Sequence, residues 1–364
     1  MTKEQILAAT EYIATLLLSM HNGERPAPLP SDITLLDVYK VASKHSLAPA
    51  TYAALGDALL DSDLPDAERK LWARGLDMAM IQQVYHTTAF SELTSAFSEA
   101  RILFLPIKGF IIKDLWKRPE LRTMADMDVV VSPRDFKRAG EILLSLGYIV
   151  EEENEVHTSY VKGKFIHVEL HRTLYDGATA SFSEWTAKTD NPYWYEMSYP
   201  DLVSFLLRHA YKHYESGGCG LRTVFDLYLL FERYGSPASI LGLMERLDRE
   251  GLGEFTKIMI ALIERWFMNI PHPEIEEEAL YIATGGVYGT FENSVNYSIK
   301  KRGGKLHHVL YRVFPPYKVI SARYKWVKKC PVLLPIAYVA RIFTAIFDRG
   351  SYAEMRTVEK INNK

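Results

Sequence analysis

The sequence predicts an α+β protein in which a small mixed β-sheet is flanked by N-terminal and C-terminal helical units. Apolar residues recur at helical spacing before residue 100. Short apolar and β-branched runs follow between residues 101 and 180, and helical spacing returns from Pro200 onward. The chain has 364 residues, of which 48% are hydrophobic and 24% charged, and its formal net charge is -2. These values are typical of a globular protein with two or three packed units and give no global sign of nucleic-acid binding.

The N-terminal helical unit is expected over residues 1–100. Glu4 and Glu11 interrupt the first apolar stretch, so an amphipathic helix is a better interpretation than a signal peptide. Pro, Asp and Gly residues separate the three stretches with helical spacing, which are 4–19, 33–44 and 66–100.

The sheet is expected over residues 101–180. The run ILFLPI is a short buried-strand pattern that ends at Lys108-Gly109, and DMDVVV is a second such pattern. A helix opened by Pro133 should end at Gly147, a residue suited to a left-handed cap. The strands are expected at 102–107, 126–131, 148–152, 156–162 and within 164–174, with a further short helix at 110–116.

A C-terminal helical unit is expected over residues 181–300, and a basic, aromatic helical segment over 301–364. No stretch reaches the roughly 20 apolar residues that a membrane-spanning helix needs. Cys219 and Cys330 stand far apart, without the spacing of a disulfide framework or a zinc site. We therefore expect a cytoplasmic protein, and the basic segment leaves open a peripheral association with a membrane.

Asp126 and Asp128 carry the functional argument. Side chains alternate across a strand with period two, so both carboxylates should emerge on one face of the strand 126–131. The run of three valines that follows predicts a central strand buried on both faces. Two carboxylates there would be costly without a cation, and Mg²⁺ binds one or two carboxylates together with substrate phosphates.

Glu169 is the candidate third carboxylate. In FIHVELH, Ile166, Val168 and Leu170 alternate with His167, Glu169 and His171, so the glutamate and the two histidines should share one strand face. A third carboxylate on a neighbouring strand would complete a site for two Mg²⁺ ions, which clamp the attacking and leaving oxygens during displacement at phosphorus. The alternative is an exposed strand glutamate between two solvated histidines.

The blocks IKGFIIKDLW, LRTMADMDVVV, IHVELH and HAYKHYESGG together resemble an uncharacterised nucleotidyltransferase family of the polymerase-beta nucleotidyltransferase superfamily. The resemblance is strongest over residues 101–230. It implies a polymerase-beta-like core at 101–180, with Asp126 and Asp128 as paired metal ligands and Glu169 as the third carboxylate. It also implies that Gly109 is the glycine of the loop that binds the nucleotide phosphates.

Four further residues are candidates for nucleotide binding. Lys108 adds a cation beside Gly109, where a strand-to-helix turn presents backbone N–H groups to an anion. Arg122 could reach a β- or γ-phosphate, the alternative being a surface salt bridge with Glu120 or Asp135. His209 and His213 share a helix face and suit contact with a phosphate, base or acceptor; half-buried histidines without a role are the alternative.

Arg222 and Asp226 are four residues apart and are expected to pair along a helix, or to position the site.

Residues 300–349 contain twelve Lys or Arg and one acid, a local charge of +11 against about -13 for the remainder of the chain. Aromatic residues are interleaved with the basic ones. The segment therefore has three interpretations: a face that binds RNA, a segment on a membrane surface, or a solvated basic helix packed on the acidic body. A phosphorylated glycan is a further anionic partner that it could bind.

These features favour a Mg²⁺-dependent nucleotidyltransferase that moves an NMP from an NTP to an unidentified hydroxyl acceptor and releases pyrophosphate, with Glu169 or a metal ion assisting deprotonation of the acceptor. One alternative is a non-catalytic module that binds or senses nucleotides. Another is a phosphotransferase, although the Gly-rich loop, HRD and DFG motifs of protein kinases are absent from the sequence.

Overall fold

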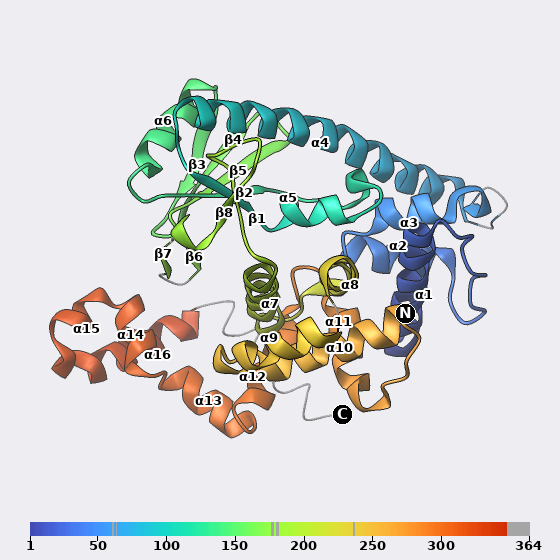
Figure 1. Ribbon diagram of the computed structural model, residues 1–364. Helices are drawn as coiled ribbons and strands as arrows, with labels where there is room; N and C mark the ends of the chain where they lie inside the picture. Colours follow the sequence, from blue (N-terminus) through green and yellow to red (C-terminus); the bar gives the residue numbers. More distant parts are fainter. Residues whose placement is uncertain (60–61, 63, 176–177, 180–181, 236, 348–364) are drawn as a thin grey trace.

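The computed structural model of the protein describes residues 1–364 except 60–61, 63, 176–177, 180–181, 236 and 348–364 (Figure 1). It confirms the predicted α+β class, with a small mixed sheet and helices on either side of it in the chain. The helices before the sheet are α1 (Lys3–Asn22), α2 (Leu35–Lys44), α3 (Ala48–Leu55) and α4 (Asp66–Glu99). The helices after it are α7 (Tyr199–Glu215), α8 (Gly220–Tyr234), α9 (Pro237–Arg249), α10 (Gly253–Phe267), α11 (Glu276–Gly285) and α12 (Phe291–Lys301).

Local sequence signals start the first two helices. Thr2 accepts a hydrogen bond from the backbone N–H of Gln5, whose side chain accepts one from the Thr2 N–H, which is a capping box at the start of α1. Thr34 and Asp37 form the same arrangement at α2. These reciprocal bonds satisfy N–H groups that have no partner within the helix.

The sheet has five strands in the order β1-β2-β5-β4-β3. The pair β2–β5 is parallel, and the other three pairs are antiparallel. The predicted strands are present with small shifts at their ends: β1 (Phe104–Ile107), β2 (Met127–Val131), β3 (Ile149–Glu153), β4 (His157–Lys162) and β5 (Ile166–His171). The short helix α5 (Gly109–Ile112) follows β1, and α6 (Phe136–Ser145) follows β2. Within the described residues, four strands of two or three residues lie between β5 and α7, namely β6 (Thr173–Tyr175), β7 (Ala178–Thr179), β8 (Thr186–Ala187) and β9 (Tyr195–Glu196).

The two faces of the sheet differ in what covers them. Met127, Val129 and Val131 of β2 face an apolar core built with Phe90 and Phe97 of α4. On the opposite face, Val130 packs with Phe205 of α7. Because side chains alternate along a strand, Asp128 lies on the same face as Val130, toward α7. The prediction that β2 is buried on both faces is confirmed, since all five of its residues are buried.

Helices from both ends of the chain share a second core. Leu16 of α1, Trp72 of α4, Phe225 of α8 and Leu262 of α10 belong to the same buried cluster. Helix α4 reaches from this cluster to the sheet, as Figure 1 shows, so it contributes to both cores. The sheet and the helical body are thereby joined by one continuous helix as well as by α7.

The chain continues beyond α12 in four short helices, α13 (Lys305–Val313), α14 (Tyr317–Arg323), α15 (Lys325–Lys329) and α16 (Leu334–Phe347). Figure 1 shows them gathered at one side of the molecule. Among the helices within the described part of the chain, none has the length and apolar character needed to cross a bilayer.

Candidate active site

Three carboxylates meet on the face of the sheet that α7 covers. Asp126 immediately precedes β2, Asp128 lies within it, and Glu169 lies directly opposite Asp128 on the parallel strand β5. Their ligand oxygens all lie within 4.8 Å of one another. Glu169 lies 43 positions after Asp126 and 41 after Asp128 in the chain, and the parallel pairing of β2 with β5 brings the three together. Their carboxylates form one cluster of hard oxygen donors, the ligands that Mg²⁺ prefers.

The ammonium of Lys108 lies among these carboxylates. Its Nζ is 2.5 Å from Asp128 Oδ1 and 3.9 Å from Glu169 Oε2. Asp128 is 2% exposed, and a buried carboxylate needs a cationic partner. Although burial opposes it, the Asp128 carboxylate raises the pKa of Lys108, so the ammonium remains charged. The backbone of Lys108 has φ +55°, an unusual value for a residue with a side chain.

Two histidines complete the cluster. His171 Nε2 donates to Asp128 Oδ1 at 2.8 Å and lies 3.3 Å from Glu169 Oε2. His157 lies opposite His171 on β4, with its Nε2 3.8 Å from Glu169 Oε1. The expected alternation in β5 is confirmed, since Ile166, Val168 and Leu170 are buried in the opposite core.

The carboxylates are electrostatically unequal. Burial, reinforced by repulsion from Asp128 and Glu169, raises the pKa of Asp126 to about 6. The hydrogen bond from His171 is the main cause that lowers the pKa of Glu169 to about 2. Asp126 is thus the carboxylate least compensated by the protein, and it would gain most from an added cation.

A depression of about 180 Å³ opens beside the carboxylates on this polar face of the sheet. Asp126 and Glu169 line it, whereas Asp128 is not among the lining residues and is in contact with Lys108. The remaining lining residues come from the segment before β2 and from β3, β4 and β5: Ala125, Glu151, Ser159, His167 and Val168. A small ligand entering here would meet two of the three acids.

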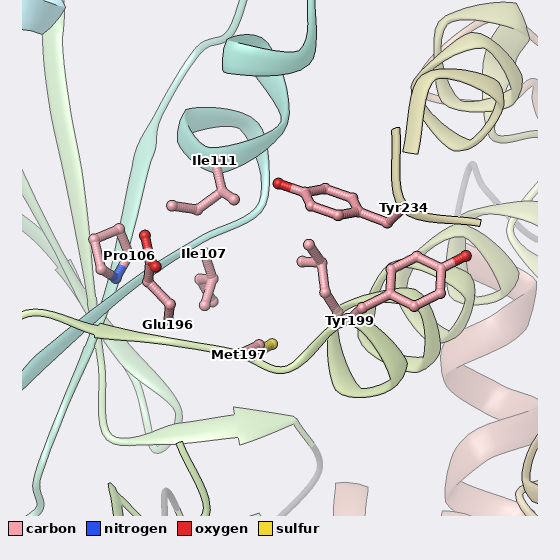
Figure 2. A pocket seen from close by; sticks show the side chains of 8 residues that line it. Pro106, Ile107, Ile111, Glu196, Met197, Tyr199 and Tyr234 are labelled. Carbon is pink, nitrogen blue, oxygen red and sulfur yellow. The ribbon is translucent and has the colours of Figure 1, made fainter. Parts of the chain in front are cut away.

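A second cavity of about 240 Å³ lies beside β1. Figure 2 shows Pro106 and Ile107 of β1 and Ile111 of α5 around it, with Tyr199 of α7 and Tyr234 at the end of α8. Ile107 is the neighbour of Asp128 in the β1–β2 register. The lining is apolar apart from Glu196 and the tyrosine hydroxyls, so it suits an uncharged part of a ligand better than a phosphate.

Arg122 is not the surface residue that one interpretation expected. Its guanidinium is buried and forms two hydrogen bonds with Asp226 of α8, Nε to Oδ1 at 2.9 Å and Nη2 to Oδ2 at 2.7 Å. Trp116 Nε1 also donates to Asp226 Oδ1. The expected Arg222–Asp226 pair is therefore wrong, because Asp226 is engaged by Arg122. A contact of Arg122 with phosphate stays a prediction. For that contact, the guanidinium would have to bind the phosphate while it is bonded to Asp226, or leave Asp226.

Gly109 and Arg122 are close neighbours. Arg122 Nη1 lies 3.4 Å from the Gly109 carbonyl oxygen, which accepts a hydrogen bond from it. A Cβ at Gly109 would meet this nitrogen at 2.9 Å and Met124 Cβ at 3.4 Å. The glycine is therefore needed where the turn after β1 approaches the segment that leads into β2. Its assignment to the phosphate loop stays a prediction.

Helix α7 brings His209 toward the carboxylates. Burial is the main cause that lowers the pKa of His209 to about 3, and the neighbouring charges of Lys108 and Asp128 act on it as well. His209 is therefore neutral at pH 7 and can donate or accept a hydrogen bond. His213 lies next to it, Nε2 to Nε2 at 3.2 Å, at the flank of the cluster. The nucleotide contacts assigned to both stay predictions.

Sequence reasoning did not assign His171 or His157 to the site, and it offered Arg222 only as a residue that could position the site. The alternation HVELH placed His171 beside Glu169, but the strand pairing that adds His157 is not a local signal. Arg222 of α8 lies near Asp126, and its Nη1 donates to the Thr123 carbonyl at 2.6 Å. Burial lowers its pKa to about 10, so it remains a cation close to the site.

Comparisons with known proteins identify the family of the chain. No curated protein matches the chain. Among solved structures, the solution structure of the antibiotic-resistance factor ANT(2'')-Ia matches at 14% identity and a TM-score of 0.36, covering 51% of this chain and 99% of that one. A family model described as an uncharacterised nucleotidyltransferase matches residues 31–268, which is more than half of the chain and includes every candidate site residue. The chain therefore belongs to this nucleotidyltransferase family.

Proposed function

We propose that the protein is a Mg²⁺-dependent enzyme that transfers an NMP from an NTP to a hydroxyl acceptor and releases pyrophosphate. One observation carries the proposal: Asp126, Asp128 and Glu169 gather around the Lys108 ammonium in a member of a nucleotidyltransferase family.

The carboxylate cluster fits Mg²⁺. Its donors are oxygens, they lie within 4.8 Å of one another, and burial together with repulsion from the neighbouring carboxylates raises the pKa of Asp126, so an added cation would be stabilised there. Asp126, Asp128 and Glu169 would hold two ions, while the hydrogen bond from His171 fixes the orientation of Asp128. When bound, Mg²⁺ supplies charge stabilisation for the triphosphate oxygens.

The residues of the chain would act on both substrates. Lys108 would exchange its contact with Asp128 for the triphosphate, and the turn at Gly109 would present backbone N–H groups to the phosphates. The acceptor oxygen attacks the α-phosphorus, the bond from that phosphorus to its bridging oxygen breaks, and pyrophosphate leaves. Glu169, which lines the depression, or a bound Mg²⁺ ion would assist removal of the proton from the acceptor hydroxyl, and that proton passes to solvent.

The direct test incubates the purified protein with each α-labelled NTP, Mg²⁺ and a cell extract, and measures the label transferred and the pyrophosphate released. Asp126→Asn and Asp128→Asn should each lower transfer by at least a hundredfold, because each removes a ligand charge. Asp190→Asn serves as a matched control, since Asp190 is an exposed aspartate away from the cluster, and it should transfer normally.

Three results would contradict the proposal. Transfer by Asp126→Asn or Asp128→Asn at the rate of the unchanged protein would remove the carboxylates from the mechanism. Release of a nucleoside diphosphate instead of pyrophosphate would indicate a phosphotransferase. NTP binding in calorimetry without any turnover would indicate a nucleotide-sensing module.

A further inference from the structure

The helices α13 to α16 form a small unit that is separate from the cores of the body. We call residues 305–347 the C-terminal module. Ile320, Val327 and Ala337 are buried in an apolar cluster of their own, and every described residue of that cluster belongs to the module. Figure 1 shows the module at one side of the molecule, away from the sheet. It also lies outside residues 31–268, the range that matches the nucleotidyltransferase family.

The module is uniformly basic. It contains eight Lys or Arg and no Asp or Glu. The lysines just before it behave differently: Lys300 pairs with Glu277, and Lys301 pairs with Glu215 of α7. These two lysines at the end of α12 therefore pair with acidic residues of the body. Within the described residues, no carboxylate lies within ion-pair distance of the exposed residues Lys318, Arg323, Lys325, Lys328 and Lys329.

Large apolar side chains are exposed on the same module. Val332 is 85% exposed, Phe343 62% and Ile336 58%. Leu306, Val309, Leu310, Phe314, Val319 and Val339 are exposed as well. So much exposed apolar side-chain area within one 43-residue module is costly in water and is typical of a surface that binds a partner.

We propose that the C-terminal module docks on the surface of a membrane that contains anionic lipids. The combination of lysines with exposed aliphatic residues distinguishes a lipid surface from RNA. Single-stranded nucleic acid is bound by positive charge and by aromatic stacking, to which Val332, Ile336 and Val339 contribute nothing. Aliphatic side chains are stabilised when they leave water for the boundary between lipid head groups and acyl chains, and Lys or Arg side chains there attract anionic head groups.

The module has the dimensions of a surface-bound element. Its helices are short, the longest being the 14-residue α16, so they would lie in the interface and not cross it. The distribution of charge along the chain favours an orientation in which the module faces the membrane and the rest of the protein faces away from it. The module is positive whereas the remainder of the chain is negative, so an anionic surface would attract the first and repel the second.

Sedimentation of the full-length protein with vesicles tests the proposal. One set of vesicles contains phosphatidylcholine alone, and the other contains phosphatidylcholine with 30% phosphatidylglycerol. We expect binding to the anionic vesicles only. Lys328→Glu/Lys329→Glu should weaken it about tenfold or more, since each basic residue contributes to attraction at the surface. Val332→Asn/Ile336→Asn should weaken it by a similar factor through the loss of apolar insertion.

Matched controls change exposed residues elsewhere on the molecule. Lys70→Glu/Lys137→Glu makes the same change of charge, and Leu71→Asn/Val84→Asn removes two apolar side chains that are 52% and 66% exposed on α4. Both controls should bind vesicles as the unchanged protein does. Failure of the unchanged protein to bind anionic vesicles would overturn the proposal. So would equal losses in the control and module variants, or release from the vesicles by a stoichiometric amount of single-stranded RNA, which would show that the surface binds RNA.

Discussion

Arg122 and Asp226 form a buried, bidentate ion pair that ties the segment leading into β2 to helix α8. Both side chains are 9% exposed, and the two N···O distances are 2.9 and 2.7 Å. The pair connects the carboxylate-bearing strand with the helical body, because Asp128 follows Arg122 within the same short segment. Trp116 adds a third hydrogen bond to Asp226. The position of the site relative to α7 and α8 therefore depends in part on one carboxylate.

Replacement of Asp226 should destabilise the fold strongly. Asp226→Ala leaves the Arg122 guanidinium buried without its partner, and loss of one member of such a pair costs about 3–5 kcal/mol. The free energy of unfolding, measured with urea, gives the result. Glu254→Ala is the control, since its pair with Lys257 is exposed, and it should leave the unfolding midpoint unchanged. Equal midpoints for the two variants would contradict the structural role of Asp226.

Two glycine-to-alanine changes should have opposite signs. Gly109→Ala places a Cβ 2.9 Å from Arg122 Nη1, which Asp226 holds in place, and such overpacking costs about 1–3 kcal/mol. Gly75→Ala in α4 meets no atom within 4 Å and should stabilise the protein by about 0.5–1 kcal/mol, since alanine is the better helix former. Thermal unfolding measures both, and a stabilising Gly109→Ala would show that the turn has room for a side chain.

Lys108→Met should separate metal binding from nucleotide binding. Removing the ammonium leaves the carboxylates with less compensating charge, so the affinity for Mn²⁺ in the absence of nucleotide should rise about tenfold. The affinity for the NTP should fall, because the phosphates lose a cation. Calorimetry with Mn²⁺ alone and then with the NTP measures the two effects, and Lys137→Met, at an exposed lysine, should show neither. Changes of both affinities in the same direction would argue against the proposed double role of Lys108.

Acid should destabilise the protein in part through His45. This residue is fully buried, its Nδ1 accepts a hydrogen bond from the Leu221 N–H, and its Nε2 donates to the Ala283 carbonyl. Burial lowers its pKa to about 4 from the ordinary 6.5. The unfolded chain therefore binds a proton at a higher pH than the folded protein does. The contribution of His45 to stability is complete above pH 6.5 and is lost as the pH falls toward 4.

Urea unfolding at pH 7.5 and pH 5.5 tests this linkage. The loss below pH 6.5 approaches about 1.4 kcal/mol per pH unit for one such histidine. His45→Gln should be less stable than the unchanged protein at pH 7.5 but should lose about 1 kcal/mol less on acidification. Burial also lowers the pKa of His86 to about 4, so part of the acid sensitivity should persist. An identical loss in both proteins would rule out the contribution of His45.

Local patterns in the sequence determined the kinds of element and the faces of the strands. The three valines after Asp128 predicted a buried strand, and the alternation around Glu169 predicted that this glutamate and His171 share a face, because periodicity is a property of neighbouring residues. The spacing of Asp126 and Asp128 similarly indicated a pair of carboxylates. These predictions needed no knowledge of what packs against either strand.

Only the tertiary structure decided which residues meet. The parallel pairing of β2 with β5 placed Glu169 beside Asp128, the turn after β1 placed the Lys108 ammonium between them, and α8 supplied Asp226 to Arg122. The helical spacing of Arg222 and Asp226 suggested that these two residues pair with each other. In the structure the partner of Asp226 is the buried Arg122, which is far from it in the sequence. The physical reason is that strand order and helix packing depend on burial across the whole chain, whereas spacing reports only what one segment can do alone.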